Sequence, residues 1–298
     1  MVQKGAIPLN FYIYTAKTGA VDVGEFSWVA LAANSSGATI SCNPKNESPA
    51  VLWNCLAKGT FACGNAEYGT EYAFHFWSGL FYNKRNALKA TNVIPAKYEI
   101  SRSTARTCFG NIRVEIVKSL YVDLAESDNQ LITDQSDAVK LKIEDQELWV
   151  SKKKLSAQSP FFDAFFNGDF KEKAEGEYKL DDVKLEEFLH FVGILHCFNM
   201  PIDGSSVEYL LKLADMWQCD MVKQRCVEFL LKATEEEIAT RKKLLLADRY
   251  ELQEVLLEIV DKVKPNEAKA FYPIPTISTF LQGLLAHKMS VVELESQK

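Results

Sequence analysis

The sequence predicts an α+β protein in three parts: an N-terminal antiparallel β-sandwich, a central α/β domain and a C-terminal helical extension. Three observations predict this order. Short runs of aromatic and β-branched residues, separated by turn-forming residues, occupy residues 9–122. A strand of alternating polarity is followed by amphipathic helices within residues 137–233. A further helical pair is expected at residues 234–264, followed by a tail at residues 265–298.

Length and composition are those of a globular protein. The chain has 298 residues, of which 47% are hydrophobic and 25% are charged, and this length allows one or two domains. No apolar run reaches the roughly 18 residues that a membrane span needs. The first ten residues lack the apolar stretch of a secretory signal. We therefore expect a cytoplasmic or nuclear protein that does not associate with a membrane.

The charge is distributed unevenly along the chain. Residues 1–130 contain 12 basic and 10 acidic residues, whereas residues 131–298 contain 22 basic and 30 acidic residues. The formal net charge of the whole chain is −6. An acidic half argues against nucleic acid as the main partner, because phosphate binding needs a basic face.

The cysteines are expected to be reduced and buried. Their number is odd, and they stand among apolar residues, as structural thiols do inside cells. Two of them, Cys219 and Cys226, lie two helical turns apart and lack the Cys-x-x-Cys spacing of zinc or redox sites. The seven cysteines are Cys42, Cys55, Cys63, Cys108, Cys197, Cys219 and Cys226.

The predicted sandwich contains several short strands. Its last strand shows the clearest alternation, because Ile112, Val114 and Ile116 point one way and the charged residues between them point the other. The segment that follows, residues 123–136, is polar and acidic and is expected to be a linker. The predicted strands lie at residues 11–14, 26–33, 51–57, 60–63, 72–77 and 109–117.

The central domain begins with a β-hairpin. Val139, Leu141 and Ile143 alternate with charged residues, which predicts a half-buried strand. The residues after it form a turn, and Leu148 and Val150 belong to the returning strand.

An aromatic helix follows the hairpin. Ser159 is a good N-cap and Pro160 suits the first helical position. Four phenylalanines then share a broad apolar face, so we expect this helix to be central. Gly168 is placed to end it. The phenylalanines are Phe161, Phe162, Phe165 and Phe166.

Later helices carry recognisable start and stop signals. Ser205 with Glu208, and Thr234 with Glu237, have the spacing of capping boxes. Pro265 ends the helical pair that follows the central domain. In the tail, only residues 277–287 have a weak helical pattern.

The central part resembles the BTB/POZ domain. About 95 residues carry this resemblance, and six stretches stand in the family's order and spacing. Residues 244–252 are similar to the helical pair that often follows BTB domains in cullin adaptors. The six stretches are residues 136–141, 152–162, 170–172, 180–183, 207–215 and 225–230.

The N-terminal part resembles the MATH (meprin and TRAF homology) sandwich. The similar stretches are residues 26–28, 52–58 and 112–116. The tryptophan-glycine and Gly-Tyr-Leu stretches of that family are not evident, and another β-sandwich family is the alternative. A MATH domain would imply a groove that recruits a client protein, but the sequence does not identify its residues.

The BTB resemblance implies a cullin-binding site. Phe170, Lys171 and Glu172 match the hydrophobic-x-Glu motif with which BTB adaptors hold a cullin. An exposed apolar anchor beside a charge is a typical hot spot. The alternative is that Phe170 packs on its own core and Glu172 is solvated. His196 stands near this surface, where the family usually has tyrosine.

The resemblance also implies a homodimer. Asp137 and Lys152 match positions near the two-fold axis of many BTB dimers, and Leu131 and Ile132 are candidates for adding apolar area there. The alternative is a solvated surface pair. Ser151 occupies a position where the family usually has histidine.

Neither catalytic residues nor cofactor or metal sites are expected. His190 and His196 lack the further ligands of a metal site, and a core or interface role is the simpler interpretation. The acidic pair Asp181 and Asp182 is expected at a strand end, as a cap or loop. The sequence also lacks the phosphate-binding and nucleophile motifs of common enzymes.

The sequence therefore predicts an adaptor that recruits a client through its sandwich, dimerises through its BTB domain and binds a cullin of a ubiquitin ligase. A BTB scaffold or regulatory protein that binds no cullin is the main alternative. A hydrolytic enzyme hidden in the sandwich is a third and weaker hypothesis.

Overall fold

The structure is a computed structural model that describes residues 3–12, 18–33, 37–65, 73–83, 87–91, 107–168, 178–264, 268 and 277–295. It is α+β, as predicted: antiparallel sheets come first and a region rich in helices follows. The chain divides into two compact units. The β-rich unit comprises Met1–Ser151 with Glu177–Gly193, and the helical unit comprises Lys152–Gly176 with Ile194–Lys298.

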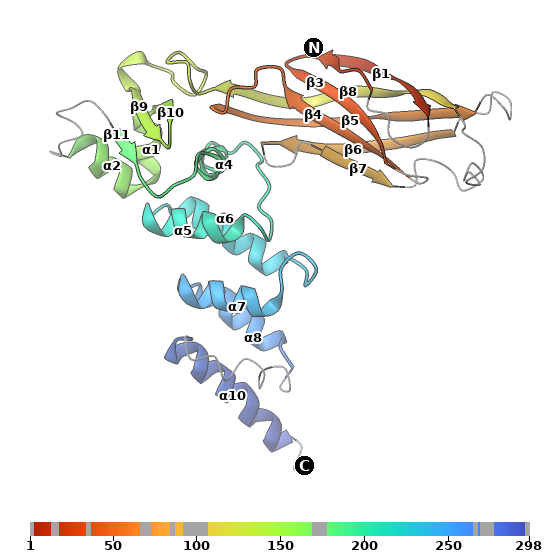
Figure 1. Cartoon of the computed structure of the whole chain (residues 1–298). Coiled ribbons are helices and arrows are strands. Elements are labelled where there is room, and N and C mark those ends of the chain that lie inside the picture. Colours follow the sequence, from red (N-terminus) through yellow and green to blue (C-terminus); the bar gives the residue numbers. More distant parts are fainter. Residues whose placement is uncertain are drawn as a thin grey trace. The chain divides into compact units, whose positions relative to one another are not determined.

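Two four-stranded antiparallel sheets form the N-terminal sandwich (Figure 1). The first sheet has the order β1-β8-β5-β6 and the second has the order β2-β3-β4-β7. The first consists of β1 (Gln3–Tyr12), β8 (Thr107–Asp123), β5 (Val51–Asn65) and β6 (Ala73–Tyr82). The second consists of β2 (Val21–Val23), β3 (Phe26–Ala33), β4 (Gly37–Pro44) and β7 (Ala87–Thr91).

One apolar core joins the two sheets. Trp28 of β3 meets Phe81 of β6 edge to face, with ring centroids 5.2 Å apart, and both rings are fully buried. Phe26 of β3 packs on Trp53 of β5 in the same core, with centroids 5.6 Å apart. Side chains from both sheets thus interdigitate, which confirms the predicted sandwich.

Strand β8 has the predicted alternation. Ile112, Val114 and Ile116 are buried in the core, while Arg113 between them is exposed. Because successive side chains of a strand point to opposite faces, the charged residues of β8 lie on the outer face of the first sheet.

The segment after β8 is packed against its own unit. The Leu124 N–H donates to the Ala50 carbonyl at 3.1 Å, and the Trp149 N–H donates to the Leu124 carbonyl at 2.6 Å. The buried amide of Asn129 donates to the Trp149 carbonyl at 3.1 Å. A short 3₁₀ helix, η3 (Gln135–Asp137), ends this connection. Polar residues of this connection, such as Asn129, therefore form hydrogen bonds with backbone groups and do not only face water.

A third, smaller sheet has the order β10-β9-β11. Strands β9 (Ala138–Ile143) and β10 (Gln146–Ser151) form the predicted hairpin, and β11 (Tyr178–Leu180) lies parallel to β9. Val139, Leu141 and Ile143 are buried as predicted. Helix α4 (Leu185–Leu195) follows β11.

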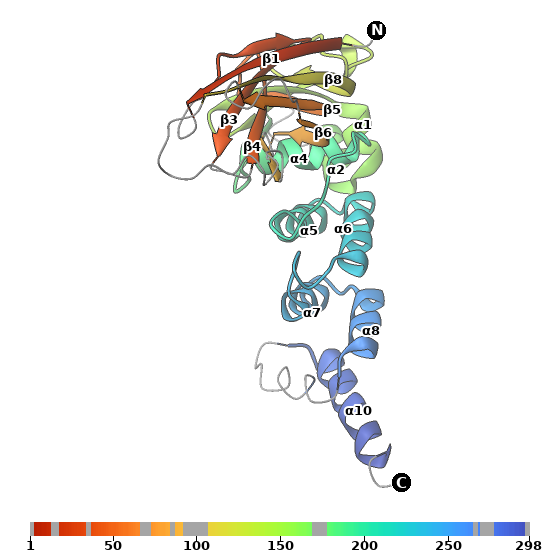
Figure 2. The same ribbon diagram turned by 90° about the vertical axis from the view of Figure 1, so that its right-hand side faces the viewer.

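The helical unit is a series of helices, with α5 and α6, then α7 and α8, and then α10 as successive layers (Figure 2). Their apolar faces are buried at the spacing expected for amphipathic helices. The helices are α1 (Lys152–Gln158), α2 (Pro160–Asn167), α5 (Val207–Met216), α6 (Asp220–Lys232), α7 (Thr240–Arg249), α8 (Gln253–Lys262) and α10 (Thr279–Glu295).

The partner of the aromatic helix α2 is Trp217, which follows α5. The rings of Phe162 and Trp217 are 5.1 Å apart, and both are buried. The Ser159 hydroxyl accepts from the Phe162 N–H at 3.2 Å and donates to the Trp217 carbonyl at 2.5 Å. The predicted N-cap is therefore confirmed, and it also ties α2 to α5. Gly168 ends α2 as predicted, although with a φ of −67°.

The C-terminal helix α10 is longer than the predicted stretch of residues 277–287 and packs on α8. Leu281 and Leu285 are buried. The Ser278 N–H donates to the Asp248 carboxylate of α7 at 2.7 Å, and the Ser278 hydroxyl binds the same carboxylate. Among the described residues, no helix is long and apolar enough to cross a membrane.

Candidate functional site

The turn after α4 carries His196, one of the residues predicted to lie near a partner surface. The His196 ring stacks on the Phe198 ring, with centroids 5.6 Å apart and an interplanar angle of 14°. Cys197 and Asn199 both have left-handed backbone conformations, with φ of 58° and 52°. Left-handed non-glycine residues are uncommon and costly, so this turn is held in a specific shape by its neighbours.

His196 is held in its neutral form. Burial, and then the positive charge of Lys154 in α1, lowers the pKa of His196 from 6.5 to about 4. A neutral imidazole still has one N–H donor and one acceptor nitrogen, whereas the tyrosine usual in the BTB family has one hydroxyl. The substitution therefore preserves an aromatic ring with a polar edge at this position.

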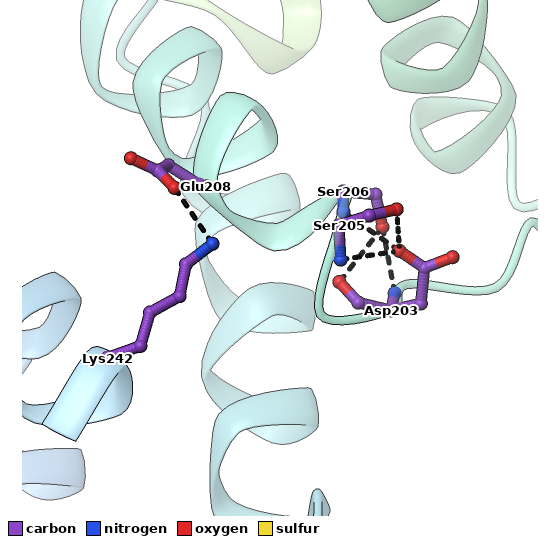
Figure 3. Close-up of polar contacts among 5 residues, drawn as sticks. All are labelled: Asp203, Ser205, Ser206, Glu208 and Lys242. Carbon is purple, nitrogen blue, oxygen red and sulfur yellow. Dashed lines mark hydrogen bonds and ion pairs between the residues drawn. The ribbon is translucent and has the colours of Figure 1, made fainter. Parts of the chain in front are cut away.

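Asp203 caps the next helix, α5. Its carboxylate accepts from the backbone N–H groups of Ser205 and Ser206 at 2.9 and 2.8 Å, and from the Ser205 hydroxyl at 2.7 Å (Figure 3). Burial raises the pKa of the Asp203 carboxyl, but these hydrogen bonds lower it, and the net pKa lies below the ordinary value. The carboxylate therefore stabilises the helix start in its ionised form.

The predicted capping box at Ser205 and Glu208 is wrong. Asp203 provides the cap, and the Glu208 carboxylate instead forms an ion pair with Lys242 of α7 at 3.0 Å (Figure 3). Glu208 and Lys242 also line a hollow of about 370 Å³ between α5 and α7. The ion pair thus links α5 of the central domain to α7, the first helix of the extension.

Removing the Asp203 cap is expected to destabilise the helical unit measurably. Asp203→Ala should lower its free energy of unfolding by about 1–2 kcal/mol, because the N–H groups of Ser205 and Ser206 lose their acceptor. Asp203→Asn keeps an acceptor oxygen and is the matched control. Urea unfolding followed by circular dichroism measures both. Equal losses in the two variants would show that charge, and not the cap, is responsible.

The joint between α6 and α7 is tied by side chains. The buried Lys243 ammonium donates to the Ala233 carbonyl at the end of α6. The Glu237 carboxylate accepts from the Thr234 N–H at 2.8 Å, which is one half of the predicted capping box. No helix begins at Thr234, however: α7 begins at Thr240, whose N–H donates to the Glu235 carboxylate at 2.8 Å.

Two of the predicted dimer residues fall in different units: Asp137 belongs to the β-rich unit and Lys152 begins the helical unit. Asp137 is buried, and its carboxylate accepts from the buried Ser151 hydroxyl at 2.5 Å. The serine that replaces the family's usual histidine is thus the direct partner of Asp137. Lys152 is half-buried at the start of α1.

Leu131 and Ile132 are buried within the β-rich unit, with 4% and 9% of their surfaces exposed. The Leu131 N–H donates to the Asn129 side chain at 3.1 Å. In the single chain these two residues therefore contribute to the intramolecular core. A role of Leu131, Ile132, Asp137 and Lys152 in dimerisation remains a prediction.

The three residues of the predicted cullin motif, Phe170, Lys171 and Glu172, lie outside the described residues. Their assignment remains a prediction from the sequence.

His190 and Cys226, for which structural roles were expected, are surrounded by packed side chains. His190 is buried, and its ring lies 6.2 Å from that of Tyr82. Burial raises the pKa of Cys226 to about 12, so this thiol stays protonated at neutral pH. Within the part of the chain that the structure describes, no group of three or more His, Cys, Asp or Glu side chains is arranged to hold a metal ion.

Sequence reasoning missed Asp203 and Lys243. A signal for Asp203 was present, since aspartate is a preferred N-cap and stands just before Ser205. Lys243 had no such signal. Its burial and its carbonyl partner depend on how α7 lies against the end of α6, which no local pattern encodes.

Comparison with known proteins identifies the central domain. Residues 129–234 match the model of the BTB/POZ domain. BTB and MATH domain-containing protein 38 of Caenorhabditis elegans is 29% identical over 239 residues, which cover 77% of this chain. Protein 36 of the same series and organism is 28% identical over 156 residues, 52% of this chain. Human Kelch-like protein 3 is 29% identical over 92 residues, 31% of this chain.

The matched regions do not span these relatives. The alignments cover 60% of BTB and MATH domain-containing protein 38, 48% of protein 36 and 16% of Kelch-like protein 3. The N-terminal β-sandwich is consistent with the MATH part of the first two relatives.

Proposed function

The chain carries a BTB/POZ domain behind a MATH-like β-sandwich, and from this premise we propose that it is an adaptor that recruits a client protein to a cullin-RING ubiquitin ligase. The observation that carries the proposal is the combination of these two modules in one chain. A sandwich and a BTB domain joined in this way suit a protein that holds two partners together. The place of action would be the cytoplasm or the nucleus.

Such an adaptor performs no chemistry on its client. It raises the effective concentration of the client beside the ubiquitin-transferring enzyme, because both are bound to the same chain. In this proposal the BTB domain forms a homodimer through the surface that includes Asp137 and Lys152. Two copies of the client module would then increase avidity for clients with more than one binding segment.

In this proposal the cullin is bound by the segment Phe170, Lys171 and Glu172 together with the helices of residues 234–264. The ties described above support this role for the extension. The Glu208–Lys242 ion pair and the Lys243–Ala233 hydrogen bond join α7 to the preceding helices, so the extension is not a loose tail. His196, with its ring kept neutral, would contribute an aromatic edge to the same partner surface.

A binding experiment with the N-terminal region of a cullin tests this proposal. The purified chain should retain the cullin fragment, and the double variant Phe170→Ala, Glu172→Ala should bind at least about tenfold more weakly, as expected for hot-spot residues. Phe280→Ala is the matched control, because Phe280 of α10 is an exposed aromatic residue at 46%.

The outcomes separate the hypotheses. Failure of the wild-type chain to bind any cullin fragment would reject the ligase role and favour a BTB scaffold. Binding that survives the double substitution would reject the assigned residues only. Light scattering tests the dimer, and a monomer at micromolar concentration would remove the assembly that both hypotheses share.

A further inference from the structure

The first sandwich sheet has the strand order β1-β8-β5-β6 (Figure 1). Its outer face carries exposed apolar side chains. Phe76 of β6 is 87% exposed, Val117 of β8 is 53% exposed and Leu56 of β5 is 38% exposed. Single exposed apolar residues are ordinary, but three on one sheet face indicate an interaction surface. We call this surface, with the charged residues described next, the sandwich outer face.

Strand register places cations beside these apolar residues. Glu115 of β8 pairs with Lys4 of β1 on one side and with Lys58 of β5 on the other. Arg113 lies two residues before Glu115 in β8 and pairs with Thr60 of β5. Thr60 pairs on its other side with Phe76 of β6. Because alternate residues of a strand share a face, all of these side chains lie on the sandwich outer face.

A hollow of about 480 Å³ opens on this face beside Phe76. Gly59 is required there: a Cβ at residue 59 would lie 1.8 Å from the Arg113 carbonyl oxygen and 2.8 Å from the Trp77 Nε1. Trp77 borders the hollow from the inner side of the sheet, because its indole is buried in the sandwich core beside Trp28, with ring centroids 6.2 Å apart.

The charge of the sandwich outer face is opposite to that of the whole chain. Lys4, Lys58 and Arg113 are exposed, and Glu115 is the carboxylate among them. The Glu115 carboxylate lies 3.3 Å from the Lys4 ammonium and 3.4 Å from that of Lys58, and the hydrogen bond from Lys4 lowers its pKa. Exposed ion pairs are weak, so both lysines remain able to bind another carboxylate.

We infer that the sandwich outer face binds an extended, acidic polypeptide segment of a client, with an apolar side chain packed on Phe76 and in the hollow beside it. Carboxylates of the segment would pair with Lys4, Lys58 and Arg113. This inference rests on the proposed role of the sandwich in recruiting clients, and it assigns that role a surface and a partner chemistry.

A second copy of the chain fits this surface poorly. A two-fold contact would bring each cationic patch against its own copy, and like charges directly opposed are unfavourable. An acidic partner has the complementary charge.

Fluorescence anisotropy with labelled synthetic peptides tests the inference on the full chain. The probe peptide alternates glutamate with leucine, because alternation presents both residue types along an extended segment. Two comparison peptides replace leucine by serine or glutamate by lysine. The glutamate–leucine peptide should bind at least about tenfold more tightly than either, and its affinity should fall as salt is raised.

Surface variants locate the binding. Phe76→Ser and Arg113→Glu should each lower the affinity of the chain for the glutamate–leucine peptide by about tenfold, the range of a moderate hot spot. The matched controls, Leu257→Ser on α8 and Lys45→Glu after β4, alter exposed residues away from the sandwich outer face. Both variants should bind the peptide as the wild type does. Circular dichroism confirms that all four variants are folded.

Three results would overturn the inference: no binding of the peptide, equal binding of all three peptides, or binding that Phe76→Ser and Arg113→Glu leave unchanged. Self-association of the wild type that Phe76→Ser abolishes would also overturn it, in favour of a second copy as occupant. Cullin binding is measured separately, so either proposal can fail while the other stands.

Discussion

Phe162→Ala is expected to lower the free energy of unfolding of the helical unit by about 3–5 kcal/mol, the usual cost of removing a buried phenylalanine ring. The ring is fully buried, lies 5.1 Å from the Trp217 ring and stacks on Phe166 at 5.7 Å. A cavity would open between α2 and the end of α5, where the Ser159 hydroxyl also binds the Trp217 carbonyl.

Phe161→Ala provides the matched control in the same helix. Phe161 is half-buried and stacks on Phe165 with centroids 5.5 Å apart. Its loss should cost about 1–2 kcal/mol, since less apolar area leaves contact with the protein. Urea unfolding followed by circular dichroism and tryptophan fluorescence measures both variants. If Phe161→Ala were as destabilising as Phe162→Ala, the assigned burial of α2 would be incorrect.

The second large effect is a loss of stability in acid that depends on His196. Its folded-state pKa of about 4 lies below the ordinary value of 6.5, so the unfolded chain binds the proton more readily. The stability that the neutral ring contributes is therefore complete above pH 6.5 and is lost as the pH falls toward 4. This difference in pKa corresponds to a loss of about 3 kcal/mol in the free energy of unfolding at pH 4.

His196→Tyr isolates this effect from the carboxylates that also titrate in acid. The variant restores the residue usual in the BTB family and carries no charge between pH 4 and pH 7.5. The difference in unfolding free energy between those two pH values should be about 3 kcal/mol smaller in His196→Tyr than in the wild type. His287→Gln removes an exposed imidazole from α10 as a control. An unchanged pH dependence in His196→Tyr would show that the ring is not buried as described.

Local patterns in the sequence determined much of the fold. The alternation of Ile112, Val114 and Ile116 and that of Val139, Leu141 and Ile143 predicted which strand faces are buried, because a strand has only two faces. Ser159 with Pro160 predicted the start of α2, since an N-cap acts on N–H groups only three residues away. The stretches with BTB spacing identified the central domain.

Only the tertiary structure decided which residues meet across distant parts of the chain. Trp217 as the partner of Phe162, Lys242 as that of Glu208 and Ala233 as that of Lys243 depend on how helices pack. The exposure of Phe76 likewise depends on strand register, because aromatic residues at neighbouring positions look alike in sequence. Local patterns specify which face of an element is apolar, whereas long-range packing selects the group that each face contacts.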